Sequence, residues 1–93
     1  MAISIEKISK ELEIPEDQLI KYGLKAFLEK ELILTKEDIS ILQERYRVKE
    51  IKELEEKIKK KEIPSHPAWE DLIQWENILK QKNKLDSLLG TLV

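Results

Sequence analysis

The chain has 93 residues, a net charge of -2 at pH 7 and no cysteine. This length suits one domain with a modest core, so we expect residues 1–93 to form a single helical domain. The absence of cysteine excludes disulfides and cysteine-ligated zinc, and the near-balanced charge gives no general attraction to nucleic acid or to an anionic membrane.

Charged residues make up 39% of the chain, and most of them are lysine or glutamate. An average protein has roughly 25%, and the surplus suits the exposed helices of a thermophilic source, where ion-pair networks gain value. The sequence begins without the basic and apolar regions of a secretion signal, and no stretch approaches the roughly 18 apolar residues of a membrane span. We therefore expect a cytoplasmic protein.

Helices are expected to account for nearly the whole chain. Only two glycines and three prolines interrupt it, and no segment alternates apolar and polar residues for long enough to form a strand. The first predicted helix spans about residues 4–13, with Ser4 as its N-cap. It would bury one apolar face, made of Ile5, Ile8 and Leu12.

A long second helix is predicted over residues 15–46, with Pro15 at the first helical position, where proline is well tolerated. Thr35 and Asp38 resemble a capping box that would start a new helix. The apolar rhythm argues against that break, because it continues in steps of four and three without interruption. Its positions are Leu28, Leu32, Thr35, Ile39, Leu42 and Tyr46.

This rhythm fails after Tyr46, because the next apolar series begins at Ile51. A bend is therefore expected between them. It is followed by a third helix over residues 50–62, which Pro64 terminates.

The fourth predicted helix spans residues 67–89. Pro67 opens it as Pro15 opens the second helix, with Ser65 or His66 capping its start. Gly90 is a natural C-terminal stop.

No constellation in the sequence supports catalysis or metal binding. His66 and Glu70 lie four residues apart, but a zinc site needs three or four ligands, so we interpret His66 as a turn or capping residue. Acidic pairs such as Glu55 with Glu56 suit solvated helix faces. We expect a non-enzyme with no cofactor, no metal and no small-molecule substrate.

Residues 5–25 have the length and apolar spacing of a helix-turn-helix. The apolar positions are Ile8, Leu12, Ile14, Leu19 and Tyr22. Glu13 stands where that motif usually carries a glycine, and Glu16 and Asp17 would face phosphates from the first turn of the recognition helix. A DNA-binding regulator is therefore the alternative function, and packing of two helices without DNA is preferred.

The two tryptophans, Trp69 and Trp75, are six residues apart, which places them about 240° from each other around a helix. They cannot share one narrow stripe with equal burial. Either both pack inside the protein, or one of them anchors a partner chain, since tryptophan is enriched at binding hot spots.

Three segments, PEDQLIKYGLKAFLEKEL, ERYRVKEIKELEEKIKKKEI and HPAWEDLIQWENI, resemble small all-helical archaeal proteins that include antitoxins and uncharacterised proteins. The resemblance covers roughly residues 5–89 and implies that the second helix passes straight through Thr35. Relatives usually carry Tyr-Gly-Val where this chain has Tyr46, Arg47 and Val48. Because the glycine is missing, a left-handed residue is not expected at Arg47.

The resemblance implies the antitoxin half of a two-gene toxin-antitoxin module. Such a protein would neutralise a nuclease-like or nucleotidyltransferase-like toxin by covering its active site with a helix. The C-terminal helix is the candidate contact, and its candidate partner-binding residues are Trp69, Leu72, Trp75 and Glu76.

The predicted fold is all-α with four helices, in which the others pack against the long second helix. That helix, about 48 Å long, exceeds the roughly 26 Å diameter of a compact domain of this length, so its apolar stripe is expected to find a second copy. We predict a homodimeric bundle with an interface formed by Leu28, Leu32, Ile39, Leu42 and Tyr46.

Overall fold

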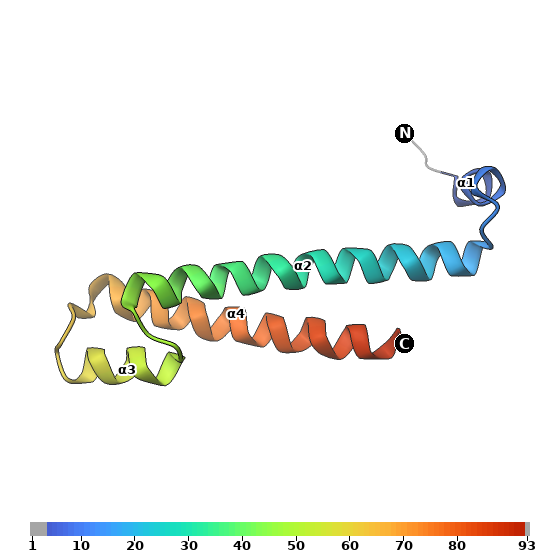
Figure 1. Cartoon of the computed structure of the whole chain (residues 1–93). Coiled ribbons are helices and arrows are strands. Elements are labelled where there is room, and N and C mark those ends of the chain that lie inside the picture. The colour runs from blue at the N-terminus through green and yellow to red at the C-terminus, as the bar shows by residue number, and fades with distance from the viewer. Residues whose placement is uncertain (1–3, 93) are drawn as a thin grey trace.

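The structure, a computed structural model, describes residues 4–92, and every regular element in that range is an α-helix (Figure 1). The elements are α1 (Ile5–Leu12), α2 (Glu16–Tyr46), α3 (Ile51–Lys59) and α4 (Ser65–Thr91). The prediction of an all-α chain is confirmed. None of these helices combines the length and the apolar character needed to cross a membrane.

The long second helix is continuous, as the apolar rhythm predicted. Thr35 lies inside α2 with its side chain buried, and its Oγ1 donates a hydrogen bond to the carbonyl oxygen of Glu31 at 2.8 Å. The hydroxyl therefore bonds to the backbone of the preceding turn, as threonine hydroxyls in helix interiors commonly do, and does not cap a new helix. Pro15 is the N-cap of α2, one position before its predicted place.

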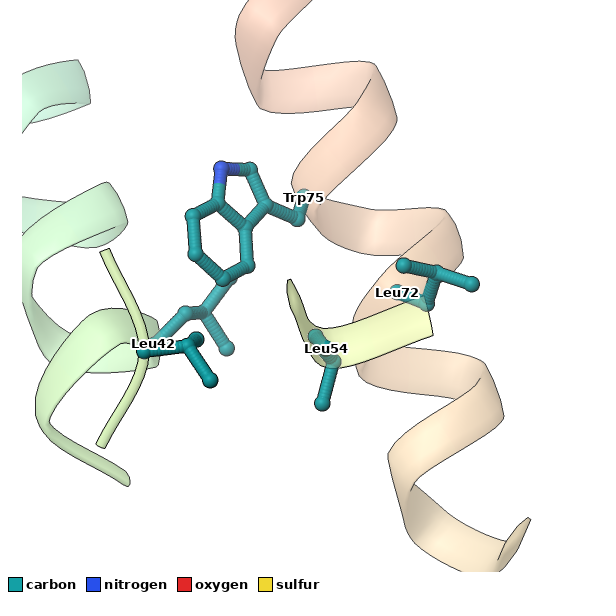
Figure 2. Packing of buried hydrophobic residues seen from close by; sticks show 5 residues of the cluster. Leu42, Leu54, Leu72 and Trp75 are labelled. Atoms are coloured by element: carbon teal, nitrogen blue, oxygen red, sulfur yellow. The ribbon is translucent and has the colours of Figure 1, made fainter. Parts of the chain in front are cut away.

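The fold is organised by α4, which turns back and runs antiparallel along α2, while α3 packs near the turn between them (Figure 1). Leu42 from α2, Leu54 from α3, and Leu72 and Trp75 from α4 meet in the core (Figure 2). Val48, in the α2–α3 connection, completes this cluster. No residue of α2 before Thr35 is buried, so this cluster lies at one end of the molecule, and Leu85 in the second half of α4 is buried apart from it.

The first helix forms but does not bury its apolar face. Ser4 accepts a hydrogen bond from the backbone N–H of Lys7 at 3.2 Å, which confirms it as the N-cap. The expectation that this face is buried is wrong, because α2 extends beyond the end of α4 and holds α1 where no third element reaches it (Figure 1). The exposed apolar residues of α1 are Ile5, Ile8 and Leu12.

The end of α2 corrects the expectation for Arg47, which adopts a left-handed conformation with φ 54° and ψ 46°. The N–H of Val48 then donates to the carbonyl oxygen of Gln43 at 3.0 Å, which closes the helix end. Val48 is buried in the core, so burial of this one side chain offsets the strain at Arg47.

The bounds of the last two helices also differ from prediction. The third ends at Lys59, not at 62, because Lys61 takes a left-handed conformation with φ 58°. Gly90 does not stop α4, which continues to Thr91. The backbone at His66 is non-helical, so the continuous part of α4 begins at Pro67 as predicted, although no side chain caps it.

The molecule is a rod rather than a globule. Its principal extents are 61 × 29 × 16 Å and its Cα radius of gyration is 19.4 Å. A compact domain of 93 residues would have a radius of gyration of about 12 Å. The elongation follows from α2, which has 31 residues and extends far beyond the core that packs against its C-terminal end.

Replacing Arg47 by glycine should raise the free energy of unfolding by about 0.5–1 kcal/mol. The gain comes from removing the left-handed strain, reduced by the larger conformational entropy of unfolded glycine. The measurement is the midpoint of urea unfolding followed by circular dichroism. Glu44→Gly, inside α2, is the matched control and should lose about 1 kcal/mol; a loss of stability in Arg47→Gly would contradict the prediction.

Candidate interaction surface

The start of α4 is fixed to the end of α2 by three polar side chains, Arg45, Tyr46 and Asp71, which we call the Asp71 cluster. Arg45 Nη1 donates to Asp71 Oδ2 at 2.9 Å, and the Tyr46 hydroxyl donates to the same oxygen. Asp71 is buried, so its carboxylate needs these donors. Residues 45 and 71 are thereby held together across the antiparallel pair.

The cluster shifts the pKa of each of its members. The hydrogen bond from Tyr46 lowers the pKa of Asp71 below its ordinary value of 3.8, against the opposing effect of burial and with further help from Arg45. Burial, and then the hydrogen bond to Asp71, raise the pKa of Tyr46 to about 12. At neutral pH the cluster therefore holds an ionised carboxylate and a protonated phenol.

The α2–α3 connection is fixed by side chains that bond to its backbone. Lys57 Nζ donates to the carbonyl oxygen of Tyr46 at 3.1 Å, and Gln43 Nε2 donates to that of Lys49 at 2.8 Å. The N–H of Lys49 donates to Glu53 Oε2 at 3.1 Å. This end of the rod is therefore a well-bonded platform for α4.

The two tryptophans separate as their 240° spacing indicates. Trp75 is 2% exposed and lies in the core, whereas Trp69 is 50% exposed. The candidate partner-binding residues divide in the same way, because Leu72 is buried beside Trp75 while Glu76 is exposed. The assignment of Leu72 and Trp75 to a partner contact is therefore corrected: both are occupied by the chain's own α2 and α3.

Trp69, Ile73 and Glu76 form what we call the Trp69 surface. Their spacing of four and three places them on one face of α4, which is centred about 100° around the helix from the core positions Leu72 and Trp75. Ile73 is exposed. Sequence reasoning did not single it out for binding, although its position four residues after Trp69 was a usable signal.

Two residues of the predicted dimer interface lie in the chain's own core. Leu42 is 3% exposed, and Tyr46 packs against the same core and bonds to Asp71. The physical reason is that α4 of the same chain takes the stripe that a second copy was expected to cover. Leu28, Leu32 and Ile39 continue this stripe along α2 and are half-buried.

The remaining polar candidates lie in solvent. His66 Nδ1 is 3.5 Å from Glu70 Oε1, and both side chains are exposed. Glu55 pairs with Lys59 at 3.0 Å on the surface of α3, as acids on solvated helix faces do. Over residues 4–92, no three histidine or acidic side chains gather as metal ligands would.

The helix-turn-helix segment has the expected turn but lacks the expected packing. Glu13 is left-handed, with φ 56°, at the position where the motif usually has glycine. Leu12 and Tyr22, which would pack between the two helices, are exposed. Glu16 and Asp17 stand exposed in the first turn of α2.

Tyr46→Phe should lower the free energy of unfolding by about 1–2 kcal/mol at neutral pH, because it removes a hydrogen bond to a buried carboxylate. The control is Tyr22→Phe, at an exposed tyrosine of the same helix, which should change stability by less than about 0.5 kcal/mol. Equal stability of Tyr46→Phe and the native chain would show that the bond contributes nothing.

The pH dependence of stability follows from the direction of each pKa shift. The lowered pKa of Asp71 gives stability that is present above its ordinary value of 3.8 and is lost as pH falls below it. The raised pKa of Tyr46 gives stability that is complete below its ordinary value of 10.0 and is lost as pH rises through about 12. Unfolding curves of the native chain and Tyr46→Phe should therefore converge between pH 10 and about 12.

Comparison with known proteins identifies the family of this chain. The family model described as "Uncharacterized protein MJ0235 family" matches residues 1–92. A search of curated proteins and a search of solved structures gave no match. The match spans nearly the whole chain, and this protein belongs to the MJ0235 family.

Proposed function

We propose that this protein is a non-enzymatic interaction module that binds a partner protein through the Trp69 surface. The observation that carries the proposal is the exposure of Trp69 beside Ile73 on a helix whose neighbouring side, with Leu72 and Trp75, is packed into the core. Tryptophan dominates many binding interfaces because it buries a large area at little cost in conformational entropy.

Rigidity of the platform favours binding. Leu72 and Trp75, on the same turns of α4 as the Trp69 surface, are buried, and Asp71 is bonded to the end of α2. The helix therefore presents Trp69 in a fixed direction. A preorganised surface loses less entropy on association than a mobile one.

The charges around Trp69 indicate the chemistry of the partner. Glu70 and Glu76 are exposed on the same turns of α4. An apolar anchor with carboxylates at its edge complements an apolar pocket bordered by basic side chains. Nuclease-like and nucleotidyltransferase-like proteins bind anionic substrates through basic sites, so an antitoxin that covers such a site is the specific form of our proposal.

The antitoxin form of the proposal predicts that a short reading frame for a nuclease-like chain is co-transcribed with this protein. The test produces that chain together with this protein and measures their binding by calorimetry. Trp69→Ala should weaken the complex about 30-fold, which corresponds to the roughly 2 kcal/mol of a binding hot spot. The thermal unfolding of the free Trp69→Ala variant should be unchanged, because Trp69 lies outside the core.

Ile33→Ala is the matched control, since Ile33 is a similarly exposed apolar residue on α2. It should bind the partner as the native chain does. No complex with the neighbouring product would contradict the antitoxin form of the proposal. A complex that Trp69→Ala leaves intact would contradict the assigned surface.

A further inference from the structure

A second line of apolar side chains runs along α2 and touches no other element of the fold extensively. Its members, spaced by seven residues, are Ile20, Phe27, Leu34 and Ile41, and all are exposed. We call them the second stripe. It spans about 32 Å at 1.5 Å per residue. Leu24, also exposed, lies beside it.

The second stripe is distinct from the positions that α4 covers. Ile41 directly precedes buried Leu42, and Leu34 directly precedes buried Thr35, so each lies about 100° around α2 from its neighbour. One helix thus carries two apolar lines, of which the chain itself covers one. A strict seven-residue spacing keeps side chains on one seam when two helices wind around each other.

The chain exposes more surface than a compact chain of its mass. A compact monomer of 11.0 kDa exposes about 5,600 Å², and this chain exposes 7456 Å². The excess is therefore about 1,800 Å² per chain. A stable interface of standard size removes about 800 Å² from each partner, so the excess is sufficient for one.

We propose that the second stripe is a self-association surface, on which a second copy of this chain lays its own second stripe. A symmetric pair is the simplest occupant, because each copy has the same uncovered line and the same excess area, and a twofold contact covers both at once. The two α2 helices form the centre of the dimer, and each α4 lies outside them. The Trp69 surface, on α4, takes no part in this contact.

The charges beside the second stripe fit a helical partner better than a membrane. Lys30 and Glu31 flank its middle, and Glu37 and Asp38 flank the next turns. On one edge Lys30 and Glu37 have opposite charges, and on the other edge Glu31 and Asp38 are both acidic. Charged residues beside an apolar seam are typical of paired helices, where they set the partner and the direction. An anionic membrane surface would repel the three acids.

The test is the mass of the protein in solution, measured by sedimentation equilibrium at micromolar concentration. The native chain should sediment at twice its 11.0 kDa mass. The double variant Phe27→Glu with Leu34→Glu should weaken association at least about a hundredfold and sediment as a single chain, because it places a charge at both central positions of the seam. A native chain that sediments as a monomer would overturn the proposal.

Ile33→Glu is the matched control. Ile33 is 58% exposed and Leu34 is 44% exposed, and they are adjacent on α2 but point about 100° apart. The control should remain dimeric, and dissociation equal to that of the double variant would overturn the assigned surface. If the glutamates reduce helix content, alanine variants replace them in the same measurement. Phe27→Ala with Leu34→Ala should then weaken association, and Ile33→Ala should remain dimeric. Trp69→Ala should stay dimeric.

Discussion

The antiparallel pairing of α2 with α4 is the interaction on which the rest of this structure depends. It begins where Leu42 meets Trp75, next to the bonds from Arg45 and Tyr46 to Asp71. At this end, α3 closes the core over Leu54. Further along, Leu85 of α4 is buried between the two helices, but α2 has no buried residue before Thr35. We call the end where α2, α3 and α4 meet the tight end, and the remaining length, where α2 pairs with α4 alone, the shaft.

Both proposed surfaces follow from this division. At the tight end, burial of Leu72 and Trp75 fixes α4 so firmly that Trp69 is presented outward. Along the shaft, α4 covers one apolar line of α2 and leaves the other in water. The first surface is a compact anchor suited to a partner's pocket, and the second is a long seam suited to another helix.

Helical periodicity made much of this fold predictable, because it is a local property of the sequence. The unbroken rhythm through Thr35 indicated one long α2, and the spacing of Trp69 and Trp75 indicated unequal burial. The occupant of the Leu42 stripe was not predictable, since the same spacing suits α4 of one chain or a second copy. The left-handed Arg47 was missed because burial of Val48, a tertiary effect, outweighs its local cost.

The pairing of α2 with α4 and both proposed surfaces require that α2 is a single helix through Thr35, and this central claim can be tested by one distance. The chain has no cysteine, so Gln18→Cys with Ser40→Cys places spin labels on two exposed sites only. Dipolar spectroscopy, with labelled protein diluted in unlabelled protein, should give one narrow distribution near 33 Å for 22 residues at about 1.5 Å each. A broad or much shorter distribution would mean that α2 breaks near Thr35, and would contradict the account.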